Sequence, residues 1–176
     1  MKIITFSRQF PKGHPNAGQP TFFIEKVLLG LLENGQISIS KCVELAREAG
    51  LDKNHPMYYI DTLRGYDCSF LKYHTIRSGS RFKPGDWASL RVWSDKPYRS
   101  KQIEFAQVEV KKVWSVEINE FWFIDGEIFE HDSVIDLAAN DGLLYYDFIS
   151  WFKIHPKKSD DVFKGQIICW SSGIEY

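Results

Sequence analysis

The chain has 176 residues and a mass of 20.5 kDa, with 22 Lys and Arg against 23 Asp and Glu. This length favours a single domain, and a composition of 44% hydrophobic and 26% charged residues excludes wholesale disorder. The apolar runs are far shorter than the ~20 residues of a membrane span, and the first residues do not read as a signal-peptide core, so we expect a cytoplasmic protein without a membrane partner. The three cysteines form no CxxC pair and the five histidines show no metal-ligand spacing, so we expect no disulfide framework, metal or cofactor.

The first part of the chain combines strand, loop and helix signals. In order, the pattern predicts a strand at 2–6, a loop at 8–20, helices at 21–32 and 40–49, and mostly loop at 51–68 with room for a short helix at 57–63. Thr21 is the expected start of the first helix. Ser38 or Ser40 can cap the second, and Gly50 is placed to end it.

After residue 70 the apolar period changes to two, which indicates strands. We expect strands at 87–93, 103–118, 121–124, 127–129 and 163–170, a hairpin turn at Asp125-Gly126, and helical residues at 133–153 interrupted by Gly142. Asp132 or Ser133 is the expected helix cap, and Trp87 and Trp93 share a strand face that we expect in the core. The predicted fold class is α+β: one domain over 1–176 with a small, mostly antiparallel β-barrel and helices packed outside.

The near-neutral net charge conceals two oppositely charged segments. Between Lys72 and Lys112 there are ten Lys and Arg but only four Asp and Glu, whereas 113–152 contains nine acids and no Lys or Arg. The basic segment is suited to a partner that carries phosphates. Alternatively, basic and acidic strands lie side by side and their charges cancel.

Two short motifs resemble a known family. Lys72-x-x-Thr75-Ile76-Arg77 is followed by Pro84-Gly85-Asp86, and Leu137-Ala138-x-x-Asp141-Gly142 is followed by Phe148 and Trp151-Phe152. Together they resemble the ASCH domains of the PUA-like superfamily, closely over 65–170 and loosely over 1–32, with 33–68 as an insertion. The resemblance implies a PUA-like barrel with a cleft, association with RNA or nucleosides, and, in some members, hydrolysis of an N4-acylated cytidine.

The motif residues define a candidate catalytic set of Lys72, Thr75 and Asp141. Thr75 would act as a nucleophile with Lys72 as its base, which requires a neutral Lys72 whose pKa is lowered by burial or by a neighbouring cation. Asp141 stands where similar amidohydrolases have Glu, which is one methylene longer. The plain alternatives are a solvated Lys72, an ordinary strand Thr75 and an Asp-Gly turn at Asp141.

Seven further residues are candidates for binding RNA or a nucleoside: Arg77, Arg81, His74, Tyr98, Arg99, Lys101 and Arg8. Basic side chains interleaved with aromatic rings suit single-stranded nucleic acid, because rings stack on bases while cations contact phosphates. Strand alternation points His74 away from Thr75, so His74 either contacts a base or phosphate or is simply a partly exposed residue.

Three functions follow from these observations. The first is an ASCH-type module that binds RNA or a modified nucleoside in a basic cleft. The second is an amidohydrolase that deacylates an N4-acylated cytidine-like nucleoside. The third is a protein-interaction domain that takes no ligand and uses its acidic, aromatic half as a partner face. The sequence gives no oligomeric state.

Overall fold

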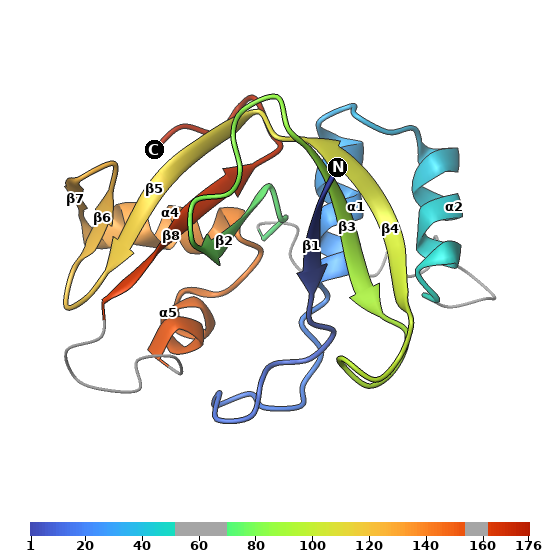
Figure 1. The fold of residues 1–176 in the computed structure, drawn as a ribbon, viewed down its shortest axis with the longest axis horizontal. Coiled ribbons are helices and arrows are strands. Elements are labelled where there is room, and N and C mark those ends of the chain that lie inside the picture. Colours follow the sequence, from blue (N-terminus) through green and yellow to red (C-terminus); the bar gives the residue numbers. More distant parts are fainter. Residues whose placement is uncertain (52–69, 154–161) are drawn as a thin grey trace.

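Eight strands in two sheets and four helices make up the described part of the chain (Figure 1). The computed structural model describes residues 1–51, 70–153 and 162–176, so the predicted helix at 57–63 lies outside the described residues. The strands are β1 (Lys2–Phe6), β2 (His74–Ser78), β3 (Trp87–Trp93), β4 (Gln102–Glu109), β5 (Lys112–Ile118), β6 (Trp122–Ile124), β7 (Glu127–Phe129) and β8 (Phe163–Cys169). The helices are α1 (Phe23–Glu33), α2 (Ile39–Glu48), α4 (His131–Asn140) and α5 (Tyr145–Lys153).

The sheets are mostly antiparallel, as predicted for an α+β chain. One sheet has the order β1-β3-β4 and the other β2-β8-β5-β6-β7, and the β1–β3 pair is parallel. The strand pairing of the described residues does not close into a barrel. The two sheet edges β1 and β2 are instead bridged by arginine side chains, since Arg77 donates to the Thr5 carbonyl at 2.8 Å and Arg81 to the Ile3 carbonyl at 2.6 Å.

The predicted strand at 103–118 is two strands that belong to different sheets. The chain passes from β4 to β5 at Val110 and Lys111, where the Val110 N–H donates to Asp86 O and the Lys111 N–H to Cys169 O, both at 2.8 Å. Figure 1 shows β4 and β5 following one another across the top of the molecule, so this bend connects the two sheets. Val108 and Val110 before the bend and Trp114 and Val116 after it keep the same alternation, with Lys112 as its one interruption, so the sequence alone predicted one strand.

The first two helices form close to where they were expected. α1 begins after Phe22 rather than at Thr21, because the Thr21 hydroxyl donates to Ser7 O at 2.7 Å instead of capping the helix. Ser38 caps α2 by accepting from the Lys41 N–H, and Gly50, with φ +74°, follows its end. α2 belongs to the predicted insertion and packs on α1 and β4.

The second helical region is divided as expected but starts earlier. Gly142, with φ +76°, separates α4 from α5, and Asp125 and Gly126 both have the positive φ of the predicted hairpin turn. The expected caps Asp132 and Ser133 are wrong, because α4 already begins at His131 and Glu130 makes no side-chain capping bond.

The expected core position of two tryptophans is also wrong. The apolar residues of β3 that are buried are Ala88, Leu90 and Val92, whereas Trp87 is 54% exposed and Trp93 is half-buried. Within the described residues, no helix combines the length and the apolar composition that crossing a membrane would require.

We expect Gly165→Ala to destabilise the fold by about 3 kcal/mol, because a Cβ there would overlap the Arg77 carbonyl group, with the carbonyl carbon only 2.9 Å away. Urea unfolding followed by circular dichroism would measure the change. Gly173→Ala is the matched control, since a Cβ at Gly173 meets only Ser171 Oγ at 4.0 Å. Equal stability of the two variants would contradict the tight β2–β8 contact.

Candidate functional site

One cavity of about 660 Å³ contains most of the candidate residues. Its wall is formed by β1 and the loop after it, by β2 and the residues around it, by the turn after β3, and by Trp151 and Phe152 of α5. Six of the ten candidates line it: Lys72, Thr75, Arg77, Arg81, Tyr98 and Asp141. The structure therefore brings the two motifs, which are far apart in the sequence, to one place.

Backbone contacts bring Lys72 and Asp141 together. The two residues form an antiparallel bridge just before β2 and just after α4, and the Tyr73 N–H donates to Asn140 O at 2.8 Å. The Lys72 N–H donates to Lys26 O of α1 at 3.2 Å, and Gly30 of the same helix allows this approach because a Cβ there would lie 3.1 Å from Lys72 O. Two separate segments, α1 and the end of α4, thus fix the position of Lys72.

The side chains of Lys72 and Asp141 form a buried ion pair. Lys72 Nζ donates to Asp141 Oδ1 at 2.7 Å and to the Asp141 carbonyl oxygen at 2.6 Å, and it lies 4.2 Å from the centre of the Phe23 ring. Lys72 is 1% and Asp141 6% exposed. Although Asp is one methylene shorter than Glu, the backbone bridge places Asp141 close enough for direct contact.

Burial makes Lys72 an unusually acidic lysine. Loss of hydration lowers the Lys72 pKa to about 8, while the attraction and hydrogen bond of Asp141 oppose this shift and Arg77 adds to it. Burial likewise raises the Asp141 pKa. At neutral pH most Lys72 side chains are charged, and a minority of about a tenth is neutral and able to accept a proton.

Thr75 lies beside this pair on the cavity wall and is 4% exposed. Among the described residues, no hydrogen bond joins its hydroxyl to Lys72 or Asp141. A proton transfer from Thr75 to Lys72 therefore needs a bridging water or a closer approach in a ligand complex.

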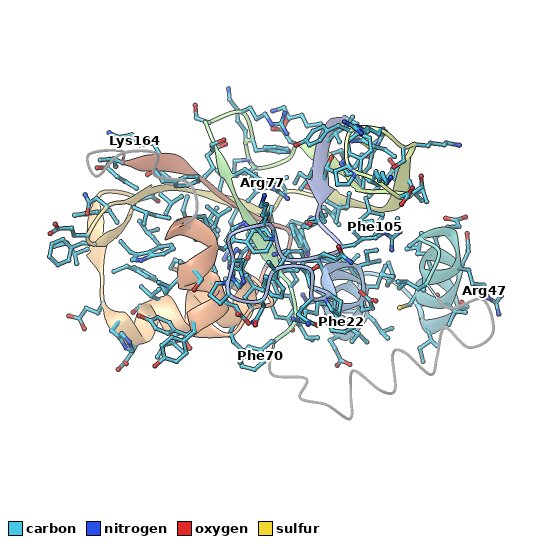
Figure 2. The ribbon with its side chains drawn as sticks, turned by 90° about the horizontal axis from the view of Figure 1, so that it is seen from below. Phe22, Arg47, Phe70, Arg77, Phe105 and Lys164 are labelled. Carbon is cyan, nitrogen blue, oxygen red and sulfur yellow. The ribbon has the colours of Figure 1, made fainter. Side chains whose placement is uncertain are left out.

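Arg77 and Arg81 leave the cavity with unbalanced positive charge. Arg77 lies near the centre of the molecule, between the two sheets (Figure 2), with its guanidinium 5.4 Å from the centre of the Phe6 ring. Its Nε is buried and finds no hydrogen-bond partner among the described residues. Within residues 1–51, 70–153 and 162–176, neither Arg77 nor Arg81 forms an ion pair with a carboxylate.

His74 is placed in the core instead of on the cavity wall. It is completely buried on the other face of β2, with Nδ1 3.6 Å from Asp141 Oδ1 and its ring against Tyr176. Burial and the Lys72 charge hold the His74 pKa well below its usual range, so the ring is neutral. The expected contact of His74 with a base or phosphate is therefore wrong, because the side chain has no access to a ligand.

Three other candidates lie outside the cavity wall. Arg8 is used structurally, since its guanidinium donates to Trp93 O at 3.1 Å and to Ala49 O at 2.6 Å and so links the ends of β1, β3 and α2. Arg99 and Lys101 are exposed next to the cavity residue Tyr98.

The sequence missed Trp93 and Lys26. Trp93 lines the cavity and contacts the Tyr98 ring, with 5.4 Å between the ring centres. Trp93 stands at the end of a predicted strand and five residues before Tyr98, and this spacing was the signal that could have placed it at the site. Lys26 holds the turn after Asp141, because its Nζ donates to Gly142 O at 2.6 Å. No local sequence pattern indicates this contact.

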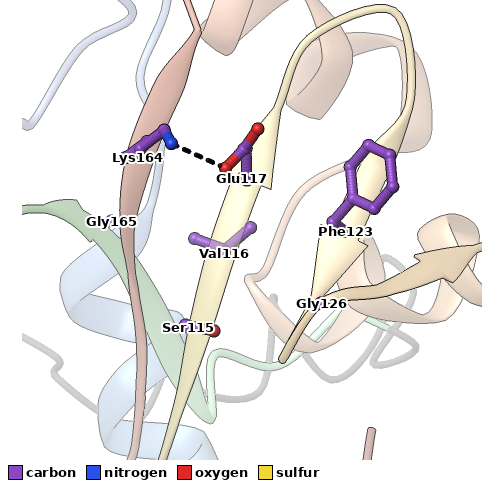
Figure 3. Close-up of a pocket in the computed structure, with 7 residues that line it drawn as sticks. All are labelled: Ser115, Val116, Glu117, Phe123, Gly126, Lys164 and Gly165. Atoms are coloured by element: carbon purple, nitrogen blue, oxygen red, sulfur yellow. Dashed lines mark ion pairs between the residues drawn. The ribbon is translucent and has the colours of Figure 1, made fainter.

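A second, smaller cavity of about 380 Å³ contains none of the candidates. It lies along β5, β6 and β8 and is crossed by the exposed Lys164–Glu117 ion pair at 3.0 Å (Figure 3). In the part of the chain that the structure describes, no cluster of three or more His, Cys, Asp or Glu is arranged to hold a metal ion.

Comparison with other proteins adds no assignment. No family model, curated protein or solved structure matches this chain. The interpretation of the cavity therefore depends on its own geometry and on the motifs that meet there.

We expect one lysine side chain to titrate near pH 8 in an NMR titration of the lysine Cε signals, and Lys72→Met to remove that signal. Asp141→Asn should lower the Lys72 pKa further, because the carboxylate stabilises the charged amine. Between about pH 8 and 10.5 the unfolded chain keeps a proton that the folded chain has released, so the contribution of Lys72 to the unfolding free energy rises with pH.

The control for this titration is Glu109→Gln, which removes the partner of the partly exposed Lys111 and should leave the Lys72 signal unchanged. A chain in which every lysine titrates above pH 10 would show that Lys72 is not desolvated.

Proposed function

We propose that this chain is a PUA-like, ASCH-type module that binds RNA or a modified nucleoside in the 660 Å³ cavity. The observation that carries the proposal is the convergence of Lys72, Thr75, Arg77 and Asp141 on one cavity wall. The ASCH motifs contain these residues, and a loop-and-turn interpretation of the same residues gives no reason for them to meet. In this proposal the two open sheets correspond to the small barrel of the family.

The charge of the cavity supports an anionic partner. Of the described residues, three cations and one carboxylate line it, and Asp141, the carboxylate, is already paired with Lys72. The remaining surplus of positive charge, carried by Arg77 and Arg81, attracts phosphates. Aromatic side chains on the same wall offer surfaces on which a base can stack.

The surface beside the cavity extends this basic character. Arg99 and Lys101 are exposed on either side of Ser100, next to Tyr98 at the cavity wall. A single strand with one nucleotide in the cavity can place its neighbouring phosphates against these side chains.

We expect the affinity for single-stranded RNA to fall linearly with the logarithm of salt concentration, because bound cations replace condensed counterions. Arg81→Ala or Arg99→Ala should reduce that slope by roughly one for each phosphate that the variant no longer binds. Fluorescence anisotropy with a labelled oligonucleotide at several salt concentrations measures this. Salt-independent affinity, or no binding at low salt, would contradict RNA backbone recognition.

A second candidate function, amide hydrolysis, is favoured by the position of Thr75 and the buried Lys72 on one cavity wall, where burial lowers the Lys72 pKa to about 8. Neutral Lys72 would take the Thr75 hydroxyl proton while the Thr75 oxygen attacks the acyl carbon of an N4-acylated cytidine. The C–N bond then breaks, and the cytidine amine leaves with the proton from Lys72. Water hydrolyses the acyl-Thr75 ester, while Asp141 orients the Lys72 amine.

We expect an active enzyme to release cytidine from N4-acetylcytidine at a rate that increases with pH and levels off above about pH 8, because the base must be neutral. Thr75→Ala and Lys72→Met should each lower kcat at least 100-fold, and Thr75→Ser should retain activity. Chromatography of the products measures the rates, and circular dichroism checks that the variants fold. Absence of cytidine with the unaltered chain would exclude this function and leave the binding module.

A further inference from the structure

We propose that the cavity recognises a nucleoside monophosphate, either a free mononucleotide or the phosphorylated end of an RNA chain. The phosphate would lie against Arg77 and Arg81, and the base against Trp93 and Tyr98. This inference rests on the proposed binding function and names the chemical class of its ligand.

The first observation is the uncompensated charge on two neighbouring arginines. Buried charges in proteins are normally paired, and Arg77 has a buried Nε–H for which the described part of the chain offers no acceptor. Burial lowers the Arg77 pKa and the neighbouring Arg81 charge adds to this shift, while the Asp141 carboxylate, which is already paired with Lys72, opposes it. A phosphate would supply both the missing negative charge and the missing acceptor, which a neutral nucleoside does not.

The second observation is that both guanidinium groups are already held in place. Arg77 Nη2 is fixed on Thr5 O and Arg81 Nη2 on Ile3 O, both on β1. Lys2 Nζ in turn donates to the Arg81 carbonyl. Because these bonds hold the arginines before a ligand arrives, little side-chain entropy is lost when a phosphate binds.

The third observation is the aromatic pair at the cavity. Tyr98 is 89% exposed and has φ +62°, a backbone conformation that is costly for a bulky residue. This conformation places its ring beside Trp93, and both rings line the cavity. Strained residues of this kind cluster at ligand clamps, and the two rings are large enough to stack on a base.

The aromatic pair and the arginine pair lie close together. Trp93 pairs with Gln102 in the β3–β4 register, and Gln102 Nε2 donates to Thr5 Oγ1 at 3.2 Å. Thr5 is the same residue whose carbonyl oxygen accepts from Arg77. One ligand with a base at one end and a phosphate at the other can therefore contact both pairs.

Isothermal titration calorimetry at low salt tests this inference with three sets of probes: the four nucleoside monophosphates with their matching nucleosides, inorganic phosphate, and a short RNA with and without a 5′- or 3′-terminal phosphate. We expect the best monophosphate to bind at least ten times more tightly than its nucleoside. Arg81→Ala should remove this difference. Tyr98→Ala should weaken the monophosphate about tenfold and leave inorganic phosphate unchanged.

Arg47→Ala is the matched control, because Arg47 is an exposed arginine of α2 that lies far from Arg77 (Figure 2), and it should change no affinity. If Arg81→Ala does not fold, Arg81→Lys is the second variant, because it keeps the charge but not the planar guanidinium. We then expect a partial loss of the affinity difference between the monophosphate and its nucleoside.

The outcomes separate this inference from the binding function. Two results overturn the inference and leave RNA binding in place. The first is equal affinity for a monophosphate and its nucleoside. The second is weak monophosphate binding together with equal binding of RNA with and without a terminal phosphate. No binding of any probe overturns both. Tight monophosphate binding supports the inference, and the phosphorylated RNA decides the source: binding of its end indicates an RNA terminus, and exclusion of it indicates a free mononucleotide.

Discussion

The buried ion pair between Lys72 and Asp141 is the contact on which the rest of the site depends. It joins Lys72, two residues before β2, to Asp141, the residue after α4, and a backbone hydrogen bond from Lys72 to Lys26 adds α1. Removing one partner of a buried pair leaves an unpaired charge and costs about 3–5 kcal/mol in typical proteins. The cavity wall is thus tied to the packing of three segments, and its geometry is only as precise as that packing.

Much of the secondary structure could be predicted because it depends on local rules. Gly50 and Gly142 end helices, and Asp125-Gly126 forms the hairpin turn, since these residues accept positive φ at low cost. The change of sheet at Val110 could not be predicted, because apolar alternation continues across it while the hydrogen-bond partners come from Asp86 and Cys169. A pattern with period two reports which face is buried and not which sheet the strand joins.

The site was predictable where motif spacing matters and unpredictable where tertiary contacts matter. Strand alternation correctly placed the His74 and Thr75 side chains on opposite faces of β2, but only the fold shows that the face with His74 packs in the core. Arg8 and Arg77 illustrate the same limit. Both are arginines near strand ends. The Arg8 guanidinium donates to two carbonyl groups outside the cavity, whereas the buried Nε–H of Arg77 has no acceptor within residues 1–51, 70–153 and 162–176. Residue type alone does not distinguish these environments.

The parallel pairing of β1 with β3 has a consequence for the order of events during synthesis. Lys2 pairs with Ala88, which the ribosome adds 86 residues later. At about 5–20 residues per second, the first strand waits several seconds or more for its partner. During that interval its apolar residues Ile3, Ile4 and Phe6 are without their sheet, as are the carbonyl groups that later hold the arginines. A newly made chain is therefore exposed to misassociation at its first strand, which is the same strand that forms one wall of the cavity.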